Sequence, residues 1–218
     1  MPEADTITPR CPTPPAPPER SGKSFVVGVS GASGAPYAAR TLEQLLVSGA
    51  EVHLVVTKHG RRLLADELGV TRLELADLCP NLAPVPGLAD RLIVHPNEDV
   101  GAVIASGSFL HHGMAVVPCS STSLGAIASG SGSNLLTRAA IVTLKERRPL
   151  IVCHREMPLG LIDIENLRTL ALAGATLCSP NPGFYLRPAS VHDIVDFTVG
   201  KVLDLLGVDH HLRIRWTG

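Results

Sequence analysis

From Phe25 onward, short runs of apolar residues alternate with longer stretches in which apolar and polar positions follow a helical period. Each short run has the length of a strand that is buried on both faces. The predicted strands cover residues 25–29, 52–56, 92–94, 115–118, 150–153 and 176–178. Continuous apolar strands separated by helices indicate a parallel sheet that is covered on both faces.

Helices are predicted over residues 36–47, 58–68, 135–146, 165–173 and 191–206. Pro36 suits a first helical turn, where its missing N–H costs nothing. Asn134 is expected to cap the third helix, and Ser190 with Asp193 forms a capping box before the last. The pattern therefore predicts an α/β fold, a single Rossmann-like three-layer domain with a mostly parallel sheet and helices on both faces.

The first 24 residues differ from the rest, because they hold seven of the 18 prolines. Proline has no amide hydrogen and fixes φ, so we expect residues 1–24 to be a disordered proline-rich tail and residues 25–218 to form the domain. No apolar run approaches the ~18 residues of a membrane helix. No secretory signal is visible, so a cytoplasmic location is expected.

Composition and charge exclude several kinds of function. The net charge is −1 without a basic stripe, so nucleic-acid binding is not expected. The five cysteines form no CxxC pair and the nine histidines show no HxH or HExxH spacing, so neither a disulfide framework nor a metal site is expected. Apolar residues make up 45% and charged residues 18% of the chain, which indicates burial between subunits.

Glycine and polar residues collect directly after the predicted strands, where open parallel sheets bind their ligands. Such residues stand at 30–34, 57–58, 119–123, 154–156 and 182–185. Glycines at 28, 31 and 34 allow backbone N–H groups and the Ser33 hydroxyl to face an anion, although a ligand-free tight turn has the same pattern. The hydroxyl residues 120–123 suit a phosphate or a polar ring edge, and simple N-capping explains only one of the four.

Charged residues near these loops have a functional and a structural interpretation. Arg155 can bind a phosphate through paired hydrogen bonds, and Glu156 can accept or donate a proton, but adjacent charges are usually an exposed ion pair. Lys145 complements a helix dipole, which favours a solvated helix end. Arg138 lies in an apolar stretch and needs a subunit contact or an anionic ligand.

Two further residues carry little signal by themselves. Tyr185 lies in a loop rich in proline and glycine, which is typical of a surface turn. Lys201 follows Phe197 by one helical turn, and a surface lysine is the ordinary interpretation.

Together, the motifs resemble the UbiX-type flavin prenyltransferases over residues 25–216. The resemblance rests on VGVSGASGAPYAARTLEQL, ASGSFLHHGM, VVPCSSTSLGAIASG, LLTRAAIVTLKERRPLIVCHREMP and PGFYLRP. It implies a metal-independent transfer of a dimethylallyl group from dimethylallyl monophosphate to N5 and C6 of reduced FMN. The product, prenylated FMN, is the cofactor of UbiD-type decarboxylases. The resemblance also implies a homo-oligomer, typically a dodecamer, with the site between subunits.

The resemblance assigns roles to individual residues. The residues that it implies for FMN binding are Gly31, Ala32, Ser33, Thr57, Ser120, Ser121, Thr122, Ser123 and Arg155. Those that it implies for binding the dimethylallyl phosphate are Tyr185, Lys201, Lys145 and Arg138. The expected catalytic residues are Ser33, Glu156, Lys145 and Arg138. This interpretation of Lys145 replaces the solvated helix end.

Two alternatives are weighed against this function. Flavin-dependent cysteine decarboxylases carry PASANT with a functional asparagine, where this chain has PCSSTS with Thr122 at that place. A non-catalytic flavin-carrying subunit needs the glycine loop but not the Arg, Lys, Tyr and Glu group. The sequence leaves open whether the donor is a monophosphate or a diphosphate.

Overall fold

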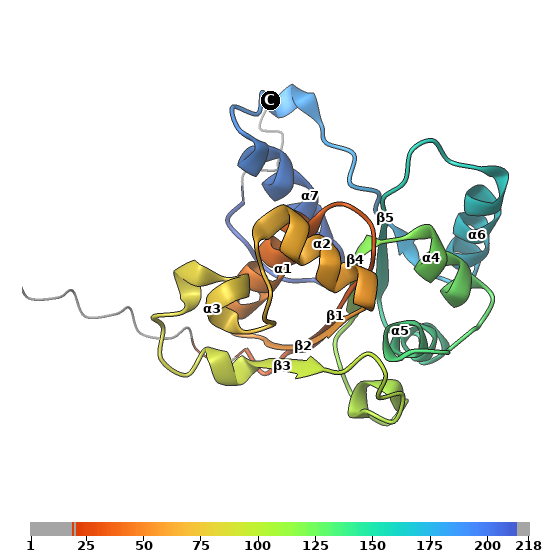
Figure 1. Cartoon of the computed structure of the whole chain (residues 1–218), viewed down its shortest axis with the longest axis horizontal. Coiled ribbons are helices and arrows are strands. Elements are labelled where there is room, and N and C mark those ends of the chain that lie inside the picture. Colours follow the sequence, from red (N-terminus) through yellow and green to blue (C-terminus); the bar gives the residue numbers. More distant parts are fainter. Residues whose placement is uncertain (1–18, 20, 213–218) are drawn as a thin grey trace, which may run out of the picture.

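A computed structural model of the protein describes residues 19 and 21–212. They form three layers, with one sheet between two layers of helices (Figure 1). The sheet has six strands in the order β3-β2-β1-β4-β5-β6, and all five pairings are parallel. The strands are β1 (Ser24–Val29), β2 (Glu51–Val56), β3 (Leu92–His95), β4 (Met114–Cys119), β5 (Leu150–His154) and β6 (Thr176–Leu177). This strand order is that of Rossmann folds, so the expected α/β fold is confirmed.

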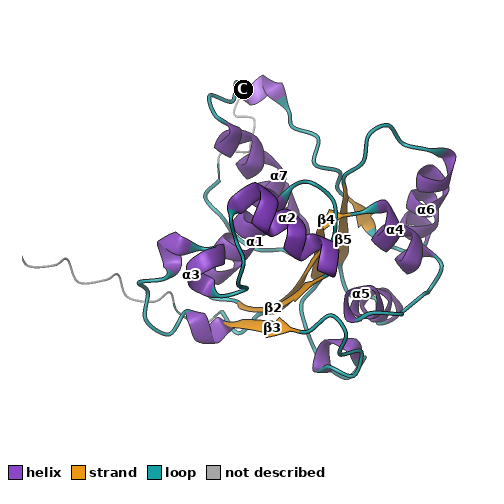
Figure 2. Cartoon of the chain, viewed as in Figure 1, coloured by secondary structure: helices purple, strands orange, loops and turns teal. Residues whose placement is uncertain are grey.

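Helices cover both faces of the sheet (Figure 2). One face packs against α1 (Ala35–Val47), α3 (Leu75–Leu78) and α7 (Val191–Leu206). The other packs against α4 (Ser121–Ala128), α5 (Leu135–Lys145) and α6 (Leu161–Leu172). The remaining helical segments are α2 (Lys58–Leu68), η1 (Pro80–Leu82), η2 (Ala89–Arg91), η3 (Val103–Ala105) and η4 (Phe184–Leu186).

The strand β1 shows why the sheet is buried on both sides. Phe25 and Val27 pack into the core under α1 and α7, while Val26 between them packs into the core under α5. Successive side chains of a strand point to opposite faces, so a strand with apolar residues at every position fills two cores. All three side chains have 0% exposure, so each contributes its full burial to stability.

The caps expected from the sequence are present. The Asn134 carboxamide oxygen accepts a hydrogen bond from the Thr137 N–H at 3.0 Å, and Ser190 and Asp193 form a capping box at the start of α7. Gly174 adopts φ +102° just beyond α6, a conformation that glycine reaches without strain.

Two elements differ from the prediction. The hydroxyl-rich segment expected as a loop forms the first turn of α4, because Ser120 caps it. The helix α6 begins at Leu161 instead of residue 165, and the Asp163 carboxylate accepts a hydrogen bond from the Gly160 N–H at 3.1 Å at its start. Leu161 and Ile162 are apolar but exposed in this first turn. The turn therefore lacks the apolar face toward the core by which a helix is recognised in a sequence.

The chain joins the sheet just before β1, which begins at Ser24. The Ser21 N–H donates to the Gly49 carbonyl at 3.0 Å, and the Glu51 N–H donates to the Lys23 carbonyl at 2.9 Å. The rest of the expected tail, residues 1–18 and 20, lies outside the described residues. Within the described part of the chain, no helix has the length and apolar character needed to span a bilayer.

Three histidines are buried together beside β2 and β3. The rings of His53 and His95 stack at 5.2 Å, with Nδ1 of His53 and Nε2 of His95 2.9 Å apart, and the His111 ring stacks on Phe109, which also contacts His53. Burial lowers the pKa of His95, and it lowers the pKa of His111 to about 4. Burial therefore favours the neutral forms of the His95 and His111 rings in the folded protein.

We expect the free energy of unfolding to decrease as the pH falls from about 6.5 toward 4, because the unfolded histidines take up protons that the folded ones resist. Denaturant unfolding at fixed protein concentration over this pH range measures the effect. The substitution His111→Gln should flatten the pH dependence, whereas His211→Gln, at an exposed position, should not. Equal pH dependences for wild type and His111→Gln would contradict the prediction.

Candidate active site

The central feature of the site is the junction of β1 and β4, where the strand order reverses. In open parallel sheets the ligand crevice lies at this point, beyond the carboxyl ends of the strands. Ser30 follows β1 and is fully buried. Its N–H and its hydroxyl both donate to the Pro118 carbonyl at 3.1 Å, and its hydroxyl accepts from the Ser120 N–H at 2.8 Å. One side chain therefore fixes the loops after β1 and β4 relative to each other.

Helices α1, α2 and α4 all begin at this crevice. The Thr57 hydroxyl caps α2 by accepting from the Gly60 N–H at 3.0 Å, and the Ser120 hydroxyl caps α4 by accepting from the Ser123 N–H at 3.3 Å. The capping interpretation is thus correct for Ser120. Helix N-termini present positive partial charge and free N–H groups, so the crevice is suited to an anion.

The loop after β1 has backbone N–H groups that can bind a ligand. Within the described part of the chain, the N–H groups of Gly31 and Ser33 have no hydrogen-bond partner. A Cβ on Gly31 would collide with the side chain of His59, so only glycine fits where the loop meets α2. The loop therefore offers two donors and the Ser33 hydroxyl, which is exposed.

The carboxylate of Glu67 is a residue of this edge that the sequence analysis missed. It accepts hydrogen bonds from the N–H groups of Gly34 at 3.0 Å and Ala35 at 2.8 Å, at the N-terminus of α1. Glu67 reaches this place because α2 lies across the carboxyl edge of the sheet, with its first and last turns both against the loop after β1 (Figure 1). No local pattern in the sequence signals that path.

Arg155 connects β5 to the same loop. Its Nε donates to the Ser33 carbonyl at 3.1 Å, and its guanidinium keeps further donors for a ligand. The neighbouring Glu156 is exposed, and its carboxylate accepts a hydrogen bond from the Met157 N–H at 3.1 Å. The structure thus brings Arg155 and Ser33 together and places Glu156 at the rim.

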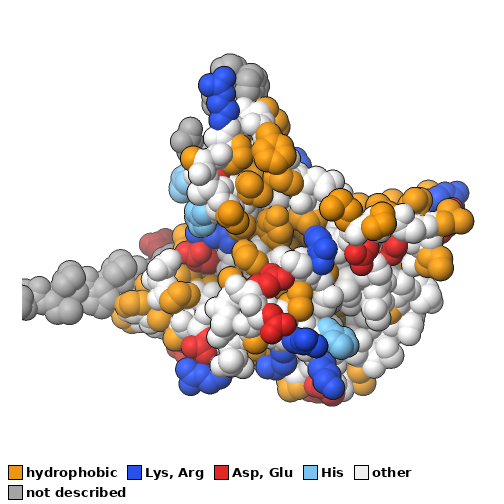
Figure 3. Space-filling view, turned by 45° about the horizontal axis from the view of Figure 1, so that its top comes forward, with side chains coloured by type: hydrophobic (Ala, Val, Ile, Leu, Met, Phe, Trp, Pro, Cys, Tyr) orange, Lys and Arg blue, Asp and Glu red, His pale blue; other side chains and the backbone are white. Residues whose placement is uncertain are grey.

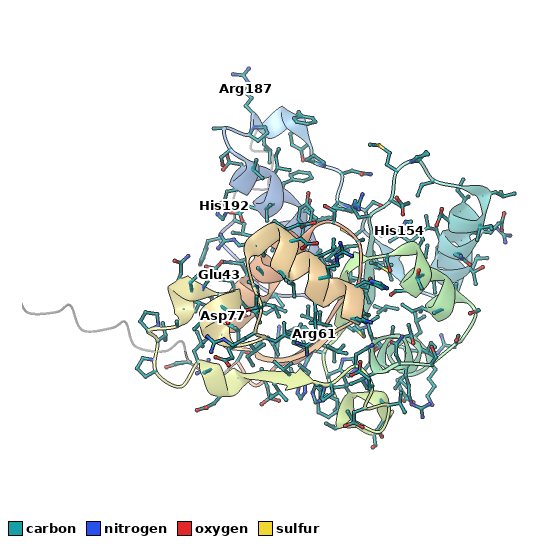
Figure 4. All side chains as sticks on the ribbon, viewed as in Figure 1. Glu43, Arg61, Asp77, His154, Arg187 and His192 are labelled. Carbon is teal, nitrogen blue, oxygen red and sulfur yellow. The ribbon has the colours of Figure 1, made fainter. Side chains whose placement is uncertain are left out.

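The buried His154, labelled in Figure 4, contacts one of the hydroxyl residues of α4. The Ser121 hydroxyl lies 3.1 Å from Nε2 of His154, and the Asp163 carboxylate lies 3.9 Å from the same nitrogen. Burial lowers the pKa of His154, while the hydrogen bond with Ser121 lowers the pKa of Asp163. In a catalytic triad the hydroxyl and the carboxylate contact different nitrogens of the histidine, whereas Ser121 and Asp163 both lie beside Nε2 of His154. The contacts are therefore structural, and they connect α4 and α6 to β5.

The four hydroxyl residues therefore divide into two groups. Ser120 and Ser123 hydrogen-bond to each other at the start of α4, and Ser121 hydrogen-bonds to His154. Thr122 is exposed in the first turn of α4.

Tyr185 and Lys201 come after β6, in η4 and α7. The Tyr185 ring packs edge-on against Phe197 of α7, with ring centroids 5.9 Å apart. Lys201 follows one turn later, is exposed, and lies close enough to the Cys178 thiol to lower its pKa. These two side chains thus share one region of the loop after β6 and α7.

Arg138 and Lys145 are exposed on α5 and lie apart from each other. The helix begins at the carboxyl edge, where the Leu135 N–H donates to the Asn97 carbonyl at 2.8 Å, and runs back toward the start of β5. At 1.5 Å per residue, the helix carries Lys145 roughly 15 Å from that edge. A single chain therefore does not bring Lys145 to Arg155.

The crevice fits a flavin mononucleotide. The N–H groups of Gly31 and Ser33 and the exposed Ser33 hydroxyl are donors for a flavin, and the N-termini of α2 and α4 with Arg155 suit a phosphate. Among residues 19 and 21–212, no three His, Cys, Asp or Glu side chains are placed to hold a metal ion.

The fold and sequence match known flavoproteins. A family model described as Flavoprotein matches residues 15–203. The flavin prenyltransferase UbiX of Thauera aromatica is 46% identical over 194 residues, which cover 89% of this chain and 94% of that protein.

Solved structures agree with this relationship. A UbiX enzyme in complex with FMN and dimethylallyl pyrophosphate has a TM-score of 0.79 and 36% identity, over 90% of this chain and 98% of its own. A dodecameric FMN-dependent UbiX-like decarboxylase from Escherichia coli O157:H7 has a TM-score of 0.78 and 37% identity, over 89% and 100%. An FMN-dependent cysteine decarboxylase from thioviridamide biosynthesis, at 16% identity and a TM-score of 0.55 over 82% and 99%, shares the fold alone.

One assignment follows from the motifs, from the edge of the sheet at which they meet, and from these similarities. The chain belongs to the flavoprotein family and, within it, to the UbiX flavin prenyltransferases.

Proposed function

We propose that this protein transfers a dimethylallyl group from dimethylallyl monophosphate to N5 and C6 of reduced FMN and so produces prenylated FMN. The observation that carries the proposal is the contact of Arg155 with the glycine loop at the β1–β4 crevice, in a chain 46% identical to a UbiX enzyme. Reduced FMN supplies the nucleophilic nitrogen and carbon when it is bound. The protein supplies binding, orientation and charge.

Binding of FMN is assigned to the crevice. Gly31, Ala32 and Ser33 contact the flavin, and the Thr57 hydroxyl, which accepts from the Gly60 N–H, still has its own hydrogen to donate to the phosphate. Further binding residues are Ser120, Ser121, Thr122, Ser123 and Arg155. Holding the acceptor near the allylic carbon supplies the entropic part of the rate enhancement.

Departure of the phosphate from the allylic carbon is the difficult step, because positive charge develops on carbon as negative charge leaves. Fixed donors in a water-poor site stabilise that charge without reorganising. The donors assigned here are Lys145, Arg138, Arg155, Tyr185 and Lys201. Glu156 and Ser33 are assigned to the proton that leaves as the second bond forms.

The site requires more than one copy of the chain. Lys145 lies at the opposite edge of its own subunit from Arg155, so we propose that it serves a neighbouring subunit's crevice. Large apolar side chains are exposed in the loop after β5, on α6 and on η4, including Met157 at 86%, Ile162 at 79% and Phe184 at 70%. Figure 3 shows hydrophobic side chains gathered on the projection at the top of the view and along the right-hand side. Patches of this kind mark interfaces, and they support a homo-oligomer, which we propose to be a dodecamer.

We further propose a recipient for the product, the extent of the domain, and the location of the protein in the cell. The product serves a UbiD-type decarboxylase. The FMN-binding domain, expected over residues 25–218, also includes residues 21–24, whose backbone joins the sheet. The protein acts in the cytoplasm, which fits the free thiols of Cys79, Cys119, Cys153 and Cys178.

Incubation with reduced FMN and dimethylallyl monophosphate, followed by mass measurement of the extracted flavin, tests the reaction. We expect the flavin to gain one five-carbon unit. Lys145→Ala should slow the reaction by about 10²–10³-fold, because one cation for the leaving phosphate is lost. Arg62→Ala, an exposed cation on α2, should not slow it. An unmodified flavin with the wild-type protein would refute the proposal.

Glu156→Gln should slow formation of the second bond by about 10²–10⁴-fold, because a proton carrier is removed. The affinity for FMN should change little, since Glu156 makes no contact with the glycine loop within the described residues. Single-turnover absorption spectra and FMN titration separate the two effects. Unchanged formation of the four-ring product would show that Glu156 is not the proton carrier.

Mixed oligomers test the shared site. Lys145→Ala and Arg155→Ala alone are each expected to react about 10²–10³-fold more slowly than the wild type. Oligomers formed from an equal mixture should regain about a quarter of the wild-type rate, because random assembly places native Lys145 beside native Arg155 in that share of sites. The matched control is the double variant Lys145→Ala/Arg155→Ala mixed with Arg155→Ala, which forms no site that has both side chains. Absence of recovery in mixed oligomers would place both side chains in one subunit.

A further inference from the structure

Cys153 and Cys178 are direct neighbours at one end of the sheet. The strands β5 and β6 pair Val152 with Leu177, so the next pair in register joins the two cysteines. The Cys178 N–H donates to the Val152 carbonyl at 2.9 Å, which continues the ladder to this point. Neighbouring strands lie about 4.7–4.9 Å apart, within the roughly 4.4–6.8 Å that separates Cα atoms in disulfides.

The two thiols also face each other. Both side chains pack into the core under α1 and α7, because residues opposite each other in register point to the same face of the sheet. The third buried thiol of the region, Cys119, packs into the opposite core and pairs in register with His154. The geometry therefore selects Cys178 as the partner of Cys153.

The two sulfur atoms have different surroundings. Cys153 is fully buried, and Cys178 is half-buried at the start of the loop toward Tyr185. The hydrogen bond from Cys153 and the charge of Lys201 lower the pKa of Cys178, and they outweigh its burial. The thiolate is the reactive form of cysteine, so Cys178 is the nucleophile of the pair and Cys153 is placed to resolve it.

We propose that Cys153 and Cys178 are a reversible oxidation site that forms an intramolecular disulfide with hydrogen peroxide as the oxidant. The Cys178 sulfur attacks one peroxide oxygen, the O–O bond breaks, and one water leaves, which gives a sulfenic acid. The Cys153 sulfur then attacks Cys178, the S–O bond breaks, and a second water leaves as the S–S bond forms. Two thiols lose two electrons and two protons in total, and one peroxide becomes two waters.

The position of the pair connects it to the chemistry of the crevice. The disulfide removes the thiolate beside Lys201 and fixes the start of the loop that carries Tyr185. Lys201 and Tyr185 are both assigned to binding of the donor phosphate. Hydrogen peroxide also forms when dioxygen oxidises reduced flavin. This local source of the oxidant rests on the proposed function, because it requires reduced FMN at the site. The disulfide itself requires neither FMN nor prenyl transfer.

Peptide mapping after oxidation tests the site. The full-length oligomer carrying Cys11→Ser is treated with one equivalent of hydrogen peroxide without FMN or donor, denatured, alkylated and digested. We expect a linked peptide pair that contains Cys153 and Cys178, lighter by two hydrogen atoms and released by dithiothreitol. Because no substrate is present, failure of this test leaves prenyl transfer untouched, and failure of the flavin assay leaves this test untouched.

Matched variants make the result specific. Cys178→Ser, or Cys178→Val if the serine variant does not fold, should abolish the linked peptide. Cys79→Ser should retain it, because burial raises the pKa of the Cys79 thiol to about 12 and leaves that thiol unreactive. A linked peptide containing Cys119, or oxidised Cys178 beside fully alkylated Cys153, would overturn the proposal.

Discussion

The hydrogen bonds of Ser30 are the interaction on which the rest of the site depends. Its hydroxyl bridges the Pro118 carbonyl and the Ser120 N–H, so the loops after β1 and β4 form one rigid unit. Helices leave these strands toward opposite faces of the sheet, and the crevice exists because the chain diverges there. Ser30 is fully buried, and leaving its hydroxyl unpaired would cost about 1–3 kcal/mol, which keeps the unit in a single arrangement.

Charge gives a physical reason for the proposed division of the site between subunits. Cations for a leaving phosphate must act where water is scarce, yet burying an unpaired cation within a folding chain costs several kcal/mol. Arg138, Lys145 and Lys201 are exposed in the single chain and therefore hydrated while it folds. Assembly of several copies can remove this water later, when the phosphate provides the opposite charge. The exposed apolar side chains beside the crevice are suited to drive that assembly.

Two polar contacts stabilise the edge without belonging to any recognisable motif. Glu67 neutralises the N-terminus of α1, which leaves the N-termini of α2 and α4 for an external anion. His154 contacts Ser121 and lies near Asp163, so this one side chain connects α4 and α6 to β5. The contact between Cys153 and Cys178 belongs to the same class, because register across the sheet creates it.

The sequence by itself determined the strands, most helices, their caps at Asn134 and Ser190, and the loops that meet at one edge, because period, capping and apolar runs are local properties. It also carried the motifs that indicated the family. Only the tertiary structure decided that α2 crosses the edge and delivers Glu67, that α5 carries Lys145 away from Arg155, and that the hydroxyl residues begin a helix. These outcomes depend on which face each helix covers and in which direction it runs, and contacts between residues far apart in the chain fix both.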